Sequence, residues 1–217
     1  MTYGSITVPP IFEGLHVEGF FTNRHFNMSL PNVYLPVQKH TDKVIVLEHD
    51  LEPRLGDAVV TNRGGILLGI QVADCVPVLL FDTVRKVVAA VHAGWRGTAE
   101  GILKNTVAVM MDRFCSSPSD LLVAIGPSIK KCCYCVGPEV IEGVARATGS
   151  GDYVAEKADK YYLDLPAANK YQAVAMGIPP GHIWISGDCT FCLPEKYYSY
   201  RYAKGTTGRQ YGLISLN

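Results

Sequence analysis

The sequence lacks several features that would commit a protein to a charged or lipid partner. Lysine plus arginine equals aspartate plus glutamate at 20 each, so the formal net charge is zero. A neutral chain has no long-range field of the kind that attracts duplex nucleic acid or anionic membranes. No stretch approaches the roughly 18 consecutive apolar residues that a membrane span needs. We therefore expect no nucleic-acid partner and no membrane partner, and a small neutral or singly phosphorylated substrate fits better.

We also expect no export signal. The first residues contain no basic region followed by an apolar core, which argues against a secretory signal peptide. Seven cysteines is an odd number, and without export we expect reduced thiols in a cytoplasmic protein. These thiols are open to metal binding or catalysis. They are Cys75, Cys115, Cys132, Cys133, Cys135, Cys189 and Cys192.

No internal repeat, low-complexity tract or Pro/Gly/Ser-rich linker divides the chain. Hydrophobic residues make up 48% of the sequence and charged residues 18%, so a substantial core can be buried. A length of 217 residues suits one large domain or two small ones, and the missing linker favours one. We therefore expect a single domain over residues 1–217, present as a monomer or a small homo-oligomer.

Short apolar runs rich in β-branched residues recur along the chain, and each ends in a polar cluster. Such runs are typical of strands that are buried on both faces. The predicted strands are residues 33–37, 44–47, 66–72, 76–81, 86–91 and 182–186.

Fewer helices are indicated. Thr98 is a plausible N-cap for a first helix. Its apolar face at helical spacing comprises Ile102, Thr106, Val109, Met110 and Phe114. Pro138 and Gly149 bracket a second helix over 139–148, and a third runs from 164 or 165 to 176. Because strands outnumber helices and several are separated only by turns, we expect an α/β fold with mixed or largely antiparallel sheets flanked by helices.

Three residues with metal-binding side chains occupy similar places in this pattern. His40, Cys75 and His92 each lie at or just beyond the end of a buried strand. Two imidazoles and one thiolate suit zinc, and three protein ligands leave a fourth position open, as in catalytic zinc sites. The spacing matches no compact local zinc motif, and any one of these residues taken alone is more often structural.

Two neighbouring residues add to this hypothesis. Asp74 stands beside Cys75 and can help to hold the metal shell by hydrogen bonding. Arg96 lies in a turn flanked by Gly94 and Gly97, where backbone N–H groups and a guanidinium can bind an oxyanion. The alternative is that Arg96 only pairs with a core carboxylate.

Several longer motifs occur in order and resemble one family. They are Gln38-Lys39-His40, Asp57-Ala58-Val59-Val60-Thr61, Ala73-Asp74-Cys75-Val76-Pro77, Val91-His92-Ala93-Gly94-Trp95-Arg96-Gly97-Thr98, Ile125-Gly126-Pro127-Ser128-Ile129 with Cys132-Cys133-Tyr134, Leu163-Asp164-Leu165 with Ala168-Asn169, and Cys189-Thr190-Phe191-Cys192 with Ser199-Tyr200-Arg201. The chain from about Gly19 to its end resembles the laccase-domain family, also called multicopper polyphenol oxidases or YfiH/YlmD-type purine nucleoside phosphorylases.

This resemblance implies a fold, a metal and a reaction. The implied fold is a single α/β domain similar to the catalytic domain of cytotoxic necrotising factor. The implied metal is zinc, held by His40, Cys75 and His92. The implied activities are phosphorolysis of adenosine, inosine and methylthioadenosine, with adenosine deamination. Copper-dependent phenol oxidation fits less well, because multicopper oxidases need about ten histidines and this chain has six.

The resemblance also suggests roles for individual residues. Cys75 and His92 would act in catalysis through the metal, and Asp74 is the nearest carboxylate to move protons in a deamination. Arg24, Arg96 and Arg201 would bind phosphate, since guanidinium groups match its oxygens. Arg24 and Arg201 resemble conserved family arginines, although each also fits a solvated or salt-bridged surface residue.

The sequence departs from the family pattern at two positions and in one segment. Cys135 replaces a glutamate that usually follows Cys-Cys-Tyr, and Tyr202 stands where a second arginine is common. The segment 24–40 is shorter than in many members. A second zinc site could in principle form from Cys132, Cys133, Cys135, Cys189 and Cys192. The pair Cys189-x-x-Cys192 has ligand spacing, and Cys135 could complete a set of three. The resembled family carries similar cysteines without a known second metal, which favours buried thiols.

Three other functions stay open at this point. Cys75 could be a metal-free nucleophile of a hydrolase, activated by His92 or His40. The chain could be a copper polyphenol oxidase, as the older family name states. It could also bind a partner without catalysis.

Overall fold

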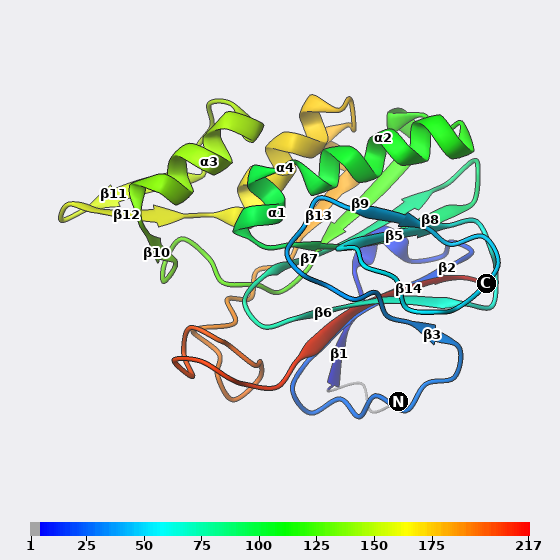
Figure 1. The fold of residues 1–217 in the computed structure, drawn as a ribbon, viewed down its shortest axis with the longest axis horizontal. Helices are drawn as coiled ribbons and strands as arrows, with labels where there is room; N and C mark the ends of the chain where they lie inside the picture. Colours follow the sequence, from blue (N-terminus) through cyan, green and yellow to red (C-terminus); the bar gives the residue numbers. More distant parts are fainter. Residues whose placement is uncertain (1–4) are drawn as a thin grey trace.

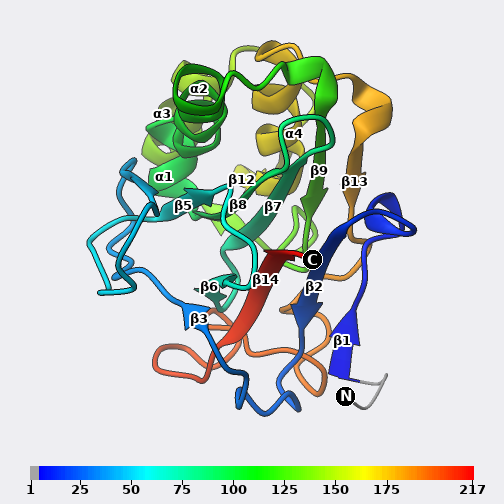
Figure 2. The ribbon, with the colours of Figure 1, turned by 90° about the vertical axis from the view of Figure 1, so that its right-hand side faces the viewer.

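Two large β-sheets pack face to face, and the helices cover the outer face of one of them (Figures 1 and 2). The structure is a computed structural model and describes residues 5–217. The six-stranded sheet runs in the order β13 (Ile183–Ile185), β9 (Leu121–Ile125), β7 (Val76–Asp82), β8 (Val87–Ala93), β5 (Ala58–Thr61) and β4 (Val44–Val46). The five-stranded sheet runs in the order β1 (Ile6–Thr7), β2 (Val17–Thr22), β14 (Gln210–Leu216), β6 (Leu67–Val72) and β3 (Val33–Tyr34).

A third, small sheet lies beside the helical layer (Figure 1). Its order is β10 (Cys135–Val136), β12 (Lys160–Leu163) and β11 (Val154–Lys157). In the two large sheets, β13 with β9, β4 with β5, and β3 with β6 are parallel, whereas the central pairs around β7, β8 and β14 are antiparallel. The prediction of an α/β fold with mixed, largely antiparallel sheets flanked by helices is therefore confirmed.

The helices are short and all belong to one layer. They are α1 (Trp95–Ala99), α2 (Ile102–Phe114), α3 (Pro138–Thr148) and α4 (Leu165–Ala175), with 3-10 turns at Pro10–Phe12, Pro118–Asp120 and Pro180–His182. Within residues 5–217, none of these helices has the length and apolar character that crossing a bilayer requires.

The alternation of side chains along the central strands explains why one sheet can serve two cores. In β7, Val78 and Leu80 face the helices, while Leu79 and Phe81 face the second sheet. Successive side chains of a strand point to opposite faces, so an uninterrupted apolar run fills both cores at once. The buried runs in the sequence thus correspond to the middle of a three-layer molecule.

Two strand predictions change in ways that affect the site. The predicted strand 33–37 is only β3, because Pro36 follows closely and has no backbone N–H to donate to a ladder. The predicted strand 86–91 is β8, which starts after a turn at Lys86 with φ 54° and continues to Ala93. His92 therefore lies within a strand and not beyond its end.

The second and third helix predictions are confirmed, and the start of the first is wrong. Helices α3 and α4 match the predicted ranges within a residue, and the Asp164 side chain caps α4 by accepting from the Ala167 N–H at 3.0 Å. Thr98 is not an N-cap but lies inside α1. The long helix α2 begins only after Gly101, whose φ of 75° interrupts the helical path between the two segments.

Candidate metal centre

The structure brings His40, Cys75 and His92 together at one end of the sheets. One ligand atom of each residue lies within 4.8 Å of the others. The Sγ of Cys75 is 3.9 Å from Nε2 of His40, and the two imidazole centroids are 4.8 Å apart. In a tetrahedral zinc site a sulfur and a nitrogen ligand are about 3.6 Å apart. The donor set therefore fits a single divalent ion with only small side-chain adjustments.

Each ligand comes from a different element. His40 lies in the loop between β3 and β4 and has a φ of 60°. Cys75 is in the turn that joins β6 to β7, directly before β7 begins. His92 is the penultimate residue of β8 and faces Pro77 of β7 in the ladder. Two of the three donors are thus fixed by neighbouring antiparallel strands, and the third by a loop.

Asp57 holds the two histidines in place, a role that the sequence did not reveal. Its carboxylate is fully buried, and Oδ1 lies 2.7 Å from Nδ1 of His92. The same carboxylate accepts hydrogen bonds from the backbone N–H groups of Lys39, His40 and Thr41 and from the Thr41 hydroxyl. With Nδ1 of His92 bound in this way, Nε2 is the nitrogen available to a metal.

The charges around the centre favour a thiolate at Cys75. Burial alone would raise the pKa of the Cys75 thiol, but the neighbouring His92 and His40 rings lower it to about 6. Burial alone would lower the pKa of His92, but Cys75 and Asp57 raise it to about 9. Burial likewise opposes ionisation of Asp57, yet hydrogen bonds from His92 and Thr41 hold its pKa well below the ordinary value. Metal binding requires this thiolate and displaces the proton from the imidazole.

Gly94 leaves the space that the centre occupies. A Cβ at this position would be 2.9 Å from Sγ of Cys75 and 3.1 Å from Cδ2 of His40. The loop that carries His40 is further tied to β6, because the Gln38 side chain exchanges two hydrogen bonds with the Gln71 backbone, at 2.8 and 2.9 Å. The space for a metal ion is therefore bounded by Gly94, which has no side chain, on one side and by the fixed loop of His40 on the other.

A pocket of about 710 Å³ opens over the three ligands. Besides His40, Cys75 and His92 it is lined by Pro36, Val37, Gln38, Gln71, Val72, Ala73, Asp74, Trp95, Arg96, Tyr134, Tyr200, Arg201 and Arg209. Its size is within the range of pockets that enclose a small ligand. The lining combines aromatic rings with three guanidinium groups, which suits a planar base together with an anion.

Two of the three arginines that line the pocket are among those that the sequence predicted. Arg96 and Arg201 line it, as expected, with the guanidinium of Arg96 4.5 Å from the Trp95 ring. Arg96 has no ion pair within residues 5–217, so it does not pair with a core carboxylate. Arg209, immediately before β14, also lines the pocket and was missed because no motif surrounds it.

Arg24 is not among the pocket residues, so the structure does not support its predicted place in a shared phosphate site. Its guanidinium donates to the carbonyl of Pro194 and lies 5.0 Å from the centre of the Tyr198 ring. Arg24 therefore ties the end of β2 to the loop before β14.

Asp74 lines the pocket but is engaged differently from the prediction. Its Oδ1 accepts from the Thr190 hydroxyl at 2.6 Å, and its Oδ2 accepts from the Arg201 backbone N–H at 2.7 Å. The hydrogen bond to a ligand ring comes from Asp57 instead. Asp74 thus joins the Cys75 turn to the two segments that form the opposite wall.

Cys135 contributes its backbone to the same wall. Its carbonyl accepts a hydrogen bond of 2.8 Å from the Arg201 guanidinium, which also lies 5.1 Å from the centre of the Tyr134 ring. Arg201 is therefore oriented by a main-chain acceptor, which does not depend on the side chain at position 135.

Comparison with known proteins identifies relatives over most of the chain. Residues 21–217 match the profile of the family described as multi-copper polyphenol oxidoreductase laccase. The purine nucleoside phosphorylase YlmD of Geobacillus stearothermophilus is 38% identical over 73% of this chain and 59% of its own length. A purine nucleoside phosphorylase of Clostridium acetobutylicum is 38% identical over 82% of this chain and 74% of its own. An adenosine deaminase from an unknown prokaryote is 34% identical over 85% and 75%.

Solved structures share the whole architecture. The crystal structure of YlmD from Geobacillus stearothermophilus superposes with a TM-score of 0.91 at 28% identity, covering 100% of this chain and 98% of that one. The structure of the hypothetical protein YfiH from Bacillus licheniformis gives 0.90 at 27% identity, with 100% and 98% coverage. The expected likeness to the cytotoxic necrotising factor domain stays a prediction.

Proposed function

The chain belongs to the family described as multi-copper polyphenol oxidoreductase laccase, and on that premise we propose that it is a zinc-dependent purine nucleoside phosphorylase that also deaminates adenosine. The substrates we propose are adenosine, inosine and methylthioadenosine, with phosphate as the second reactant. The observation that carries this proposal is the convergence of His40, Cys75 and His92 at the floor of a pocket that three arginines line.

Zinc is the metal that the donor set supports best. Two imidazoles and one thiolate also occur in copper electron-transfer sites, but those add a weak axial ligand, most often methionine. Among residues 5–217, no methionine lines the pocket. A bound Zn²⁺ would act as a Lewis acid on a substrate atom or a water molecule at its open position.

The arginines supply what phosphorolysis requires of the protein. A phosphate oxygen forms a bond to C1′ of the ribose while the C1′–N9 bond breaks, and the electron pair and a proton pass to the purine. Arg96, Arg201 and Arg209 would hold the phosphate through charge-assisted hydrogen bonds. Trp95 and Tyr200 line the same pocket and offer faces on which a purine can stack.

Deamination would use the same floor of the pocket. Water adds to the purine carbon that bears the amine, ammonia leaves, and a carboxylate must carry the proton between them. Asp74 is the one carboxylate lining the pocket among residues 5–217, so we propose it for this step. Its hydrogen bonds to Thr190 and Arg201 would fix its position during the transfer.

Product analysis with and without phosphate tests the proposal. We expect purified protein to release adenine from adenosine and hypoxanthine from inosine only when phosphate is present, and to form inosine from adenosine in either case. A chelator should abolish both reactions, and added zinc should restore them. Full activity in protein shown to be metal-free would favour the hydrolase in which Cys75 is the nucleophile. Copper-dependent oxidation of a phenol without nucleoside turnover would favour the polyphenol oxidase.

A further inference from the structure

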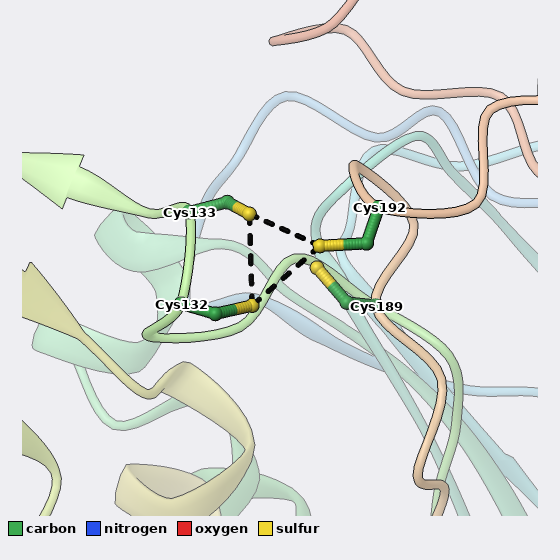
Figure 3. A group of neighbouring side chains, drawn as sticks. All are labelled: Cys132, Cys133, Cys189 and Cys192. Carbon is green, nitrogen blue, oxygen red and sulfur yellow. Dashed lines mark hydrogen bonds between the residues drawn. The ribbon is translucent and has the colours of Figure 1, made fainter.

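Four cysteine side chains form a second group, distinct from the three ligands of the pocket floor. Their sulfur atoms point toward one another (Figure 3). The sulfur atoms of Cys132, Cys133, Cys189 and Cys192 all lie within 4.8 Å of one another. Cys192 Sγ is 3.8 Å from Cys132 Sγ and 3.2 Å from Cys133 Sγ, and Cys132 and Cys133 are 3.6 Å apart. Cys135, the thiol that the sequence suggested as a partner of Cys189 and Cys192, is not in the group.

These separations of 3.2 to 3.8 Å lie at or somewhat below the edge length of a tetrahedron of sulfur around a metal. With zinc–sulfur bonds of about 2.3 Å, tetrahedral ligands lie about 3.8 Å apart. We propose that Cys132, Cys133, Cys189 and Cys192 bind a second zinc ion in a closed four-thiolate site. Four protein ligands leave no position for water or substrate, so the role of this ion is structural. This second zinc site does not depend on the reaction proposed for the pocket.

The backbone around the cluster is arranged to hold thiolates. Burial alone would raise the pKa of the Cys189 thiol, but hydrogen bonding from the backbone at Cys192 and Lys130 lowers it below its ordinary value. Hydrogen bonds of this kind orient a ligand and offset the negative charge that four thiolates leave on a divalent ion. Cys132 and Cys192 are exposed, which gives an ion a path from solvent, whereas Cys189 is buried.

The four ligands come from two segments that are far apart in the sequence. Cys132 and Cys133 lie between β9 and β10, and Cys189 and Cys192 follow β13. Main-chain contacts already place the segments side by side, since Thr190 N–H donates to the Ser128 carbonyl at 3.1 Å. An ion bound by all four sulfurs would hold the two segments together, whereas a single disulfide would involve only two of the four.

The cluster adjoins the wall of the pocket. Tyr134, the residue after Cys133, lines the pocket. Thr190, the residue after Cys189, donates its hydroxyl to Asp74. A second zinc ion would therefore fix both residues and, through Asp74, the turn that carries Cys75.

Metal counting on full-length variants tests the proposal. We expect two zinc ions per chain in the natural protein, one in Cys189→Ser/Cys192→Ser and one in His40→Ala/Cys75→Ser, measured by elemental analysis after removal of loosely bound metal. A Cys115→Ser control should keep two, because Cys115 is exposed and belongs to neither group. No zinc ion in His40→Ala/Cys75→Ser, or an unchanged count in Cys189→Ser/Cys192→Ser, would overturn the proposal.

X-ray absorption at the zinc edge identifies the ligands directly. His40→Ala/Cys75→Ser retains all four cysteines, so we expect its remaining zinc to show four sulfur neighbours at about 2.3 Å. This result does not depend on whether the cysteine variant folds. A mixed nitrogen and sulfur shell, bound iron in place of zinc, or a disulfide among these cysteines by mass spectrometry under non-reducing conditions would each contradict the proposal. Absence of nucleoside turnover in the natural protein, with the four-sulfur signal intact in His40→Ala/Cys75→Ser, would count against the proposed function alone.

Discussion

The Asp57 carboxylate and the His92 imidazole form a buried pair in which Oδ1 lies 2.7 Å from Nδ1. The strand register produces this pair, because Ala58 of β5 faces Val91 of β8 and the residues next to them are Asp57 and His92. The same carboxylate accepts from the His40 backbone N–H at 3.0 Å. One acidic residue therefore sets the tautomer of one metal ligand and the loop conformation of another.

Replacing Asp57 with asparagine should weaken metal binding. In Asp57→Asn the side-chain NH₂ group would face backbone N–H groups that donate to a carboxylate oxygen in the natural protein. The hydrogen bond that orients the His92 ring would also become weaker. Removing such an outer partner typically costs 10–100-fold in metal affinity, and we expect a loss of about that size. Competition with a chelator of known zinc affinity measures it.

Asp82→Asn is the matched control for this prediction. Asp82 is also fully buried and accepts backbone N–H groups in a turn, from Val84 at 2.8 Å and Arg85 at 2.7 Å, but it lies at the other end of β7. We expect it to lose stability without a change in zinc affinity. Equal affinity losses in the two variants would show that a general loosening, and not the Asp57–His92 pair, was responsible.

Gly94→Ala should weaken metal binding at the pocket floor while leaving the fold intact. The backbone of Gly94 has φ −69° and ψ 173°, which alanine adopts freely, so the effect is steric. The added Cβ would meet the Cys75 sulfur at 2.9 Å and displace it. We expect at least a tenfold weaker zinc affinity with an unchanged circular dichroism spectrum.

Gly143→Ala provides the comparison. Gly143 lies inside α3, and its Cβ would make only an ordinary contact of 3.5 Å with Ala99. Alanine in a helix interior is favoured over glycine by roughly 0.5–1 kcal/mol, so this variant should melt higher and bind zinc normally. Normal zinc binding by Gly94→Ala would refute the close packing inferred for the centre.

The sequence was sufficient to find the three metal-ligand candidates because each lies near the end of a buried strand and within a motif that carries the family resemblance. It was not sufficient to find Asp57, although this residue opens one of the motifs, because its role depends on the pairing of β5 with β8. Asp74 drew attention as the neighbour of Cys75 in the chain, yet its carboxylate reaches Thr190 and Arg201. Adjacency in the sequence was a poor guide to which carboxylate supports a ligand.

The fold, too, was predictable where a local pattern in the sequence determines it, and not where contacts between distant segments do. Buried strands were predictable because both faces of the central sheet are covered, which leaves continuous apolar runs. The start of the first helix was not predictable in this way. Thr98 has a side chain suited to an N-cap, but its hydroxyl accepts a hydrogen bond of 3.1 Å from the Asn169 side chain of α4. Arg209 could not be anticipated either, because its place in the pocket is set by the pairing of β14 with β6.

Substitution of an arginine that lines the pocket should weaken phosphate binding more than substitution of Arg24, which is not in the lining. Arg209→Gln and Arg96→Gln each remove a guanidinium from the lining. Hydrogen bonds to charged groups contribute about 1.5–3 kcal/mol, so we expect the KM for phosphate to rise roughly 10–100-fold. Arg24→Gln should change it less than about twofold, because Arg24 is engaged with Pro194 and Tyr198. Initial rates at varied phosphate concentration give these values, and the reverse ranking would show that phosphate binds elsewhere.

Alkylation of Cys75 should report directly on whether the centre is occupied. A thiolate bound to zinc is shielded from iodoacetamide, whereas a free thiolate beside two imidazoles reacts readily. We expect peptide mass mapping to find Cys75 unlabelled in zinc-loaded protein and labelled after chelation. The exposed Cys115, which belongs to neither cysteine-containing group, should be labelled equally in both samples and serves as the internal control. If Cys75 reacts at the same rate with and without zinc, its sulfur is not a ligand, and a metal-free role as nucleophile becomes the better explanation.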